Sequence, residues 1–319
     1  TIGLICMTMG NYWGVPALLT GGAILSGCYF GDRCSPMSSS ALLVAELTGT
    51  DIYRNIRLML KSTWQPFLVT CGIYLLLGLI LPAGNRTEYA LPPIAGFRLS
   101  WPALIPAMLI VLLSLFKLPV TGTIPLSMLA AALVAVFTQG LSPEALPGLL
   151  WYGYQAPPGS AAALLDGVGI LSMFQVAAIV CLSSSYAGIF QGTGLLNALK
   201  GRVSDLCRLL TPFGAMALLS LLTSMLLCNQ TLATMLTHQL SRDVIKDPYQ
   251  MSLSLENSAV VIAGLVPWSV ACAVPLASVS APSASVLAAC YLYLLPVFTY
   301  AVMKRRSCPW GLACEGPAA

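Results

Sequence analysis

The chain has 319 residues, of which 57% are hydrophobic and only 8% are charged, and its mean hydropathy is +0.84. Soluble domains carry about 25% charged residues, so the composition excludes a soluble enzyme or binding module and predicts an all-α polytopic membrane protein. The net charge of +4 is too small to call for nucleic acid as a partner. The 11 cysteines include no CxxC pair and there is one histidine, His238, so neither a zinc site nor a disulfide framework is supported.

Membrane spans need about 20 mostly apolar residues, and fewer where a helix is buried among others. Uninterrupted segments of this kind cover residues 64–81, 102–116, 120–137, 168–190, 212–227 and 283–303. Broken or partial segments cover residues 2–15, 17–47 and 256–280. Because the chain starts with Thr1 inside an apolar stretch, without a signal peptide, we expect further helices upstream.

The most informative segment is residues 31–51, a charged and serine-rich interruption of an apolar run. Irregular polar chain at membrane depth is tolerated only where it is buried in protein or lines a watery cavity. Pro36 explains why a helix cannot continue there. Asp32 and Glu46 in this segment are therefore functional-site candidates.

A second interruption starts at Glu256, Asn257 and Ser258 and continues at residues 266–269. Two broken helices at corresponding positions of two halves are typical of secondary transporters. The pattern predicts inverted repeats, with residues 1–81 ending the first repeat and residues 82–319 forming the second.

Basic residues orient these segments. They precede the span at residue 64, follow residue 190 and follow the last span, whereas the loop 138–167 has no Lys or Arg. The positive-inside rule places this loop outside and the basic clusters in the cytoplasm. Residues 52–61 and 195–210 have amphipathic patterns and are expected to lie in the membrane interface.

Residues 212–240 have basic flanks on both sides and a polar centre at residues 228–231. This pattern predicts a re-entrant hairpin whose tip carries Asn229, Gln230 and Thr231. Two full crossings joined by a short polar turn would give the same pattern. With the hairpin, the two broken helices are antiparallel, as an inverted repeat requires.

The segment from Gly22 to Arg33, followed by Ser35, Pro36, Met37 and Ser38, resembles the G-A-x-x-S-G-A-Y-F-G-D-K-M-S-P-L-S stretch of NhaC-type sodium/proton antiporters. The similarity returns at residues 253–258, where that family has L-x-x-x-L-E-D-S, and at residues 266–269, against I-P-W-N. It implies an ion-transporter fold of two inverted repeats, each with a hairpin and a broken helix. It also implies a first-repeat hairpin immediately before Thr1.

The chain departs from the family pattern where the family has S-D-T-T-N, because residues 38–42 read Ser-Ser-Ser-Ala-Leu. Asn257 and Ser269 likewise replace an acid and an amide. The sequence thus offers hydroxyls and freed carbonyls with fewer charges, although sodium, like other hard cations, favours several oxygen ligands.

The candidate cation- or proton-binding residues combine carboxylates with polar groups at the two breaks and the hairpin tip: Asp32, Ser35, Ser38, Ser39, Glu46, Asn229, Gln230, Thr231, Glu256, Asn257 and Ser269. Among them Asp32, Ser38 and Ser269 are the expected sodium ligands. Each carboxylate has an alternative reading. Asp32 could pair locally with Arg33, Glu46 could pair with a distant arginine, and Glu256 could be a first-turn acid favoured by the helix dipole.

The leading hypothesis is cation/proton antiport across the cytoplasmic membrane, without a cofactor and with sodium, protons and the lipid bilayer as partners. Exchange of small carboxylic acids is an alternative, because helix N-termini suit a carboxylate. A non-transporting relative and a homodimer also stay open. An intramembrane enzyme is disfavoured, since the chain offers no paired-aspartate, zinc or Ser/His motif.

Overall fold

The computed structural model describes residues 2–80, 100–116, 118, 120–154 and 210–305, together with scattered positions between 169 and 192. All regular structure in these residues is helical, which confirms the all-α prediction for the described part of the chain. The chain divides into two compact units. One comprises Thr1–Ile5 and Glu88–Ala178, and the other comprises Cys6–Thr87 and Ile179–Ala319.

The smaller unit contains two apolar helices that pack together, with shorter helices at its ends. Its elements are η1 (Trp101–Leu104), α5 (Ile105–Leu115), α6 (Val120–Gln139), η2 (Pro143–Ala145) and α7 (Leu146–Tyr152). Ser127 on α6 donates a hydrogen bond to the Pro106 carbonyl at 3.0 Å. The predicted spans 102–116 and 120–137 coincide with these helices. The predicted segments 168–190 and 195–210 lie essentially outside the described residues.

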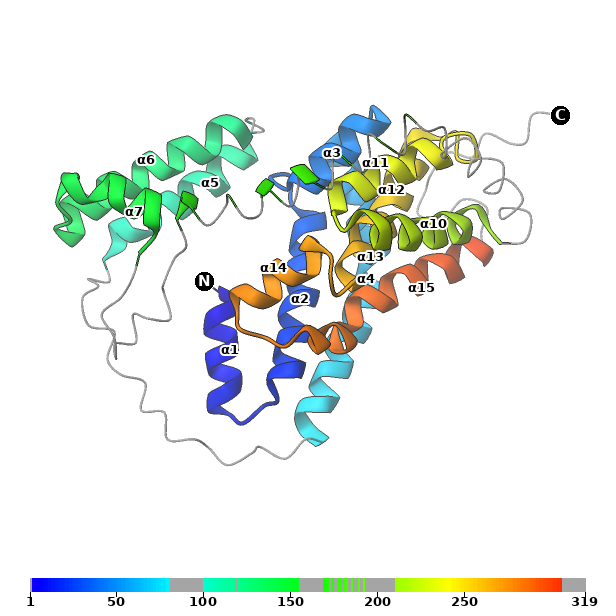
Figure 1. Ribbon diagram of the computed structural model, residues 1–319, viewed down its shortest axis with the longest axis horizontal. Coiled ribbons are helices and arrows are strands. Elements are labelled where there is room, and N and C mark those ends of the chain that lie inside the picture. The colour runs from blue at the N-terminus through cyan, green and yellow to red at the C-terminus, as the bar shows by residue number, and fades with distance from the viewer. Residues whose placement is uncertain are drawn as a thin grey trace. The chain divides into compact units, whose positions relative to one another are not determined.

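The larger unit begins with the first broken helix (Figure 1). After α1 (Ile2–Tyr12), helix α2 (Ala17–Cys34) ends before Pro36, and α3 (Ser39–Thr48) begins after Ser38. The break thus covers residues 35–38 and is narrower than the predicted segment 31–51. The Ser38 side chain accepts hydrogen bonds from the first amides of α3, and Gly49, with φ at 65°, ends that helix in the left-handed conformation that glycine allows.

Helix α4 (Ile52–Ile80) runs for 29 residues without a break. Residues 52–61, expected as a separate interfacial helix, are instead its first three turns. No glycine separates them from the apolar part, and Pro66 lies inside the helix without ending it. At 1.5 Å per residue α4 is about 43 Å long, so it can cross a hydrocarbon core of about 30 Å and extend beyond it.

The next two helices form a hairpin. They are α10 (Pro212–Leu227), which coincides with the predicted segment 212–227, and α11 (Gln230–Ser241). The Thr223 and Thr237 hydroxyls lie 3.0 Å apart across the hairpin, and Leu219 packs near Leu240. The two helices are therefore antiparallel and turn at Cys228.

The second broken helix follows, with a kink and then a break. It consists of α12 (Pro248–Asn257), α13 (Ala259–Ile262), η4 (Ala263–Leu265) and α14 (Val270–Ser278), and the parts on either side of residues 266–269 are bent by 60°. The chain ends with η5 (Ser283–Ala288) and α15 (Cys290–Arg305). The interruption predicted at residues 266–269 is confirmed. The predicted span 283–303 is divided by a break at Ala289.

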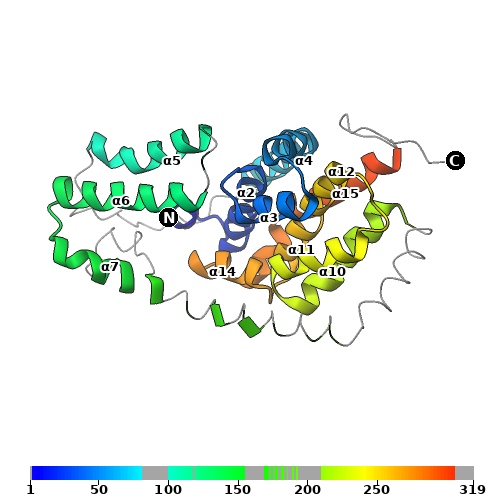
Figure 2. The ribbon, with the colours of Figure 1, turned by 90° about the horizontal axis from the view of Figure 1, so that it is seen from above.

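The core of the larger unit joins segments that are far apart in the sequence. Leu25 and Tyr29 of α2 pack with Cys272 of α14 and with Tyr291 and Leu292 of α15. Figures 1 and 2 both show α3, α11 and α12 side by side at one end of this unit. By length and composition, two described helices could cross a membrane, Ile52–Ile80 and Thr121–Gln139, or three if the bent pair forms one span.

Candidate functional site

Asp32 and Arg33 are neighbours in the sequence but belong to different environments. Asp32 accepts hydrogen bonds from the hydroxyls of Ser38 at 2.6 Å and Ser40 at 2.5 Å. The carboxylate therefore lies at the N-terminus of α3, where the helix dipole favours negative charge. It is only partly buried. The first break thus holds one anion with hydroxyl groups from its own segment.

Arg33 is completely buried, with 0% of its surface exposed. Its guanidinium donates to the Thr63 hydroxyl of α4 at 3.0 Å and to the Tyr291 hydroxyl of α15 at 2.7 Å. It also donates to the Asn257 side-chain oxygen at the end of α12. One arginine therefore connects α2, α4, α12 and α15.

Glu256 is also completely buried and lies beside this arginine. Its Oε2 atom is 3.8 Å from Arg33 Nε, and neither of its carboxylate oxygens has a hydrogen-bond partner among the described residues. The adjacent Asn257 donates to Thr299 at 3.0 Å and to Ser62 at 3.4 Å. Glu256 thus has a counter-charge within reach but no donor that fixes either oxygen.

The tip of the hairpin lies against the second break. The Cys228 carbonyl accepts hydrogen bonds from the Val270 amide at 3.0 Å and the Ser269 hydroxyl at 3.2 Å. Trp268 Nε1 donates to the Met225 carbonyl at 3.1 Å. The Asn229 side chain accepts from the first amides of α11, at 2.9 Å from Thr231 and 3.4 Å from Leu232.

The predicted site residues therefore form three groups. Asp32 and Ser38 meet at the first break, Glu256 and Asn257 meet at Arg33, and Ser269 meets the hairpin tip. Gln230 follows that tip, and its buried Nε2 atom has no partner among the described residues. Ser35 stays local, accepting from the Met37 amide at 3.2 Å.

Three candidates lie apart from these groups. Ser39, Glu46 and Thr231 are exposed on the surface of the larger unit. Conversely, sequence reasoning considered Arg33 only as a partner of Asp32 and did not identify Thr63 or Tyr291. An arginine in an otherwise apolar helix was the available signal, because such a residue needs a buried partner.

Helices α10, α11 and α12 each carry buried hydroxyls. Those without a hydrogen-bond partner among the described residues are Ser224, Thr234, Ser241, Ser252 and Ser254. In the described part of the chain, no three His, Cys, Asp or Glu residues form a metal cluster. The acidic groups at these sites are the two separate carboxylates of Asp32 and Glu256.

Comparisons with known proteins indicate the family of the chain. A family model described as the Na+/H+ antiporter family matches residues 27–303. The chain is 26% identical over 284 residues to the malate-2H(+)/Na(+)-lactate antiporter of Bacillus subtilis, covering 84% of this chain and 60% of that protein. It is 25% identical over 292 residues to the Na(+)/H(+) antiporter NhaC of Alkalihalophilus pseudofirmus, covering 85% and 61%.

A third relative is the arginine/ornithine antiporter ArcD of Halobacterium salinarum, 25% identical over 284 residues, with 84% of this chain and 58% of that protein covered. The chain thus spans less than two thirds of the length of these relatives. No solved structure gives a significant match. The relatives are named as antiporters of sodium and protons, of the carboxylates malate and lactate, and of the amino acids arginine and ornithine.

Proposed function

Because the chain belongs to the Na+/H+ antiporter family, a family of transporters and not of enzymes, we propose that it forms the exchange centre of a secondary antiporter. In this proposal a monovalent cation, sodium in the first instance, moves against protons across the cytoplasmic membrane. The observation that carries the proposal is Glu256, a buried carboxylate that accepts no hydrogen bond from the described residues.

Glu256 suits a group that changes its proton or cation during transport. A buried carboxylate that is held by several donors is locked in its charged form, whereas Glu256 has only the Arg33 guanidinium at 3.8 Å. A proton or a cation can therefore reach either oxygen without displacing a hydrogen bond from it. Ionisable groups of this kind inside membrane proteins mark ion pathways.

Asp32 is the second carboxylate of the proposed centre. Its oxygens accept hydrogen bonds from the hydroxyls of Ser38 and Ser40. When a hydroxyl hydrogen rotates away from Asp32, the lone pairs of that hydroxyl oxygen can bind a cation. Carboxylate and hydroxyl oxygens are ligands that hard cations accept. We therefore assign cation binding to the first break and proton exchange to Glu256.

The helical architecture supports a membrane transporter with inverted repeats. At 1.5 Å per residue α10 is about 24 Å long and α11 about 18 Å, and both are shorter than a hydrocarbon core of about 30 Å. We propose that the hairpin enters and leaves the membrane on the same side, with its tip at the second break. Broken helices and hairpins that meet near the midplane are a common way to build a transport site.

Exchange of organic anions is a second candidate, and Arg33 is the observation that favours it. When Glu256 takes up a proton, the buried guanidinium loses its only ion-pair partner among the described residues. An arginine fork binds carboxylates in a bidentate manner. A small carboxylate could then replace the charge of Glu256, and proton uptake would be coupled to anion binding.

Transport measurements on the complete gene product in proteoliposomes test both candidates. Addition of sodium should cause proton movement, reported by a trapped pH dye, and Glu256→Gln and Asp32→Asn should abolish this movement. Glu46→Gln is the matched control, because Glu46 is exposed and separate from both groups, and it should leave the flux unchanged.

Normal flux in both Asp32→Asn and Glu256→Gln would overturn the assignment of these carboxylates. Exchange of a labelled carboxylate without sodium-driven proton movement, and loss of that exchange in Arg33→Gln, would favour the second candidate instead.

A further inference from the structure

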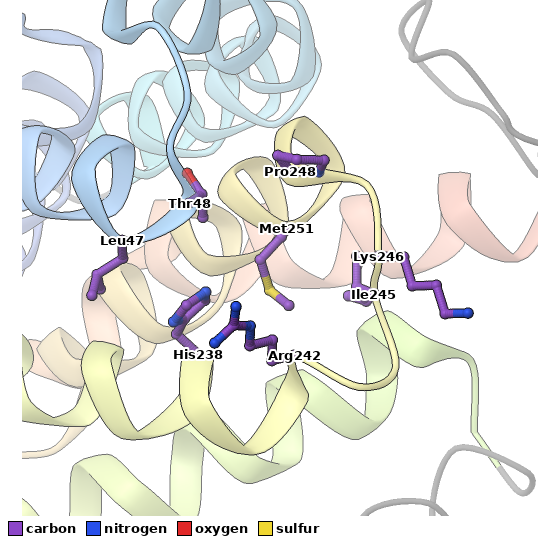
Figure 3. A pocket seen from close by; sticks show the side chains of 8 residues that line it. All are labelled: Leu47, Thr48, His238, Arg242, Ile245, Lys246, Pro248 and Met251. Atoms are coloured by element: carbon purple, nitrogen blue, oxygen red, sulfur yellow. The ribbon is translucent and has the colours of Figure 1, made fainter.

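A polar cavity of about 380 Å³ lies away from both carboxylates, at the end of the larger unit where α3 stops and α12 starts. Figure 3 shows its lining, which comes from the last turn of α3, the last turns of α11 and the connection to α12: Leu47, Thr48, His238, Arg242, Ile245, Lys246, Pro248 and Met251. The cavity is open to the surface and large enough for a small organic ion.

The cavity is lined by three basic side chains, His238, Arg242 and Lys246, and by no acidic one. Among the described residues, none of the three makes a hydrogen bond or an ion pair with a carboxylate. The nearby acids Asp243 and Asp247 do not line the cavity, and Asp247 instead accepts from the Gln250 amide at 2.9 Å as the N-cap of α12. The cavity therefore carries uncompensated positive charge.

The dipoles of the neighbouring helices do not cancel the positive charge of the cavity. The C-terminus of α3 is closed by Gly49, whose amide lies against the Ala45 and Glu46 carbonyls. The N-terminus of α12 is closed by Asp247. The ends of α3 and α12 have opposite dipoles and each is capped, and Arg242 itself lies at the C-terminus of α11, so the charge of the cavity comes from Arg242 and Lys246.

The rest of the lining is apolar. Ile245 and Met251 are buried, and Leu47 and Pro248 complete this part of the wall. A bare inorganic ion would leave the apolar surface without a partner. The lining thus fits a ligand that combines an anionic head with a carbon skeleton.

The position of the cavity indicates where such a ligand comes from. The Arg54 guanidinium lies over the Tyr249 ring, 3.9 Å from its centroid, so the start of α4 is adjacent to the start of α12. Arg54 and Arg57 lie in the first turns of α4, and Arg242 and Lys246 precede α12. The positive-inside rule therefore predicts that this end faces the cytoplasm.

We propose that this cavity is a cytoplasmic binding site for a phosphate group carried on a small organic or lipid molecule. The Arg242 guanidinium and the Lys246 ammonium match the charge of a phosphate, and Arg and Lys are its usual partners in proteins. The neutral imidazole of His238 can add a hydrogen-bond donor. The same chemistry could be offered by a soluble phosphate ester or by the headgroup of an anionic phospholipid of the inner leaflet. The ligand would bind α3, α11 and α12 together and so act on the elements that hold both carboxylates.

Binding to the purified complete gene product tests this site without any measurement of transport. In neutral detergent, glycerol 3-phosphate should raise the thermal unfolding temperature with a saturable dependence. Arg242→Gln and Lys246→Gln should each weaken this binding by about tenfold, as expected for loss of a charge-assisted hydrogen bond. Arg57→Gln is the matched control, because Arg57 is an exposed cation outside the cavity.

A second arm replaces glycerol 3-phosphate with micelles that contain phosphatidylglycerol or, for comparison, phosphatidylcholine. An effect of phosphatidylglycerol alone identifies a lipid headgroup as the source, and an effect of glycerol 3-phosphate in both backgrounds identifies a soluble ester. The inference fails if neither probe distinguishes Arg242→Gln and Lys246→Gln from Arg57→Gln. A failure of sodium/proton exchange leaves this result unaffected, since no gradient is present.

Discussion

The break between α2 and α3 is closed by side chains of its own segment, whereas the break between η4 and α14 is closed by a different element. At the first break, Ser38 caps α3 and also donates to Asp32. At the second break, the backbone carbonyls of Met225 and Cys228 accept hydrogen bonds from residues 268–270. The first break is locally encoded, whereas the second has a local cap at Ser269 and is also held by the hairpin.

The carboxylates near the two breaks differ in the same way. Asp32 receives two hydroxyl donors from six and eight residues along the chain. Glu256 receives no hydrogen bond from the described residues, and its counter-charge, Arg33, is 223 positions away in the sequence. The charge of Asp32 is therefore stabilised within its own segment, whereas the charge of Glu256 is stabilised only when several helices pack together. Four sets of variants test this difference.

The largest effect is expected for Arg33→Gln. It leaves Glu256 buried without a counter-charge, which should lower the free energy of unfolding by about 3–5 kcal/mol. The double variant Arg33→Gln/Glu256→Gln removes both charges and should recover most of the loss. Thermal unfolding of the purified protein in detergent measures both. If Arg33→Gln is as stable as the wild type, the Arg33–Glu256 ion pair does not stabilise the packing of these helices.

Gly22→Ala tests whether the placement of α2 matters for the first break. A Cβ atom at Gly22 would lie 2.6 Å from the backbone carbon of Ala288, so α2 would have to move from η5 at a cost of about 1–3 kcal/mol. At Gly27 a Cβ atom meets nothing within 4 Å. Gly27→Ala, the control, should be neutral or stabilising, since alanine favours helices. Equal melting temperatures for the two variants would contradict close packing.

Ser38→Ala should cost about 0.5–2 kcal/mol, because it removes the cap of α3 and a donor to Asp32. Ser39→Ala, at an exposed neighbouring position, should change the stability by no more than about 0.5 kcal/mol.

Ser269→Ala removes the cap of α14 and one hydrogen bond to the hairpin tip. If the breaks are closed as described, only Ser269→Ala should also speed amide exchange in the hairpin, as measured by mass spectrometry.

The smallest effect is expected at Cys228, which has a positive φ of 54° at the hairpin tip. Cys228→Gly should raise the stability by up to about 1 kcal/mol, because glycine adopts this conformation without strain. Cys228→Val, which places a branched side chain there, should lower it. Unfolding midpoints that rank valine above glycine would show that the tip conformation is not strained.

The sequence predicted the helices whose ends carry local signals. Pro212 begins α10 and the polar Asn229 separates it from α11, so both boundaries follow from neighbouring residues. Pro36 likewise located the first break. Residues 52–61 were separated from the following span because they are charged, but a helix continues through charged residues when no breaker intervenes.

The partner of Arg33 could not be found by sequence reasoning. Adjacent residues on a helix point about 100° apart, so Asp32 and Arg33 do not face each other, and a local ion pair is geometrically unfavourable. That rule removes the wrong partner but does not identify Glu256, because the meeting of α2 with α12 is a matter of tertiary packing. Thr63 and Tyr291 were missed for the same reason, since each supports the arginine from another helix.

The hydrogen bonds between the hairpin tip and residues 268–270 also have a mechanical consequence. Each contributes about 0.5–1.5 kcal/mol, so separating the tip from the break would cost about 1.5–4.5 kcal/mol for the three bonds. A movement that carries the hairpin and α14 as one rigid body costs nothing at this contact. The hairpin tip and the start of α14 are therefore expected to move together in any rearrangement of the larger unit.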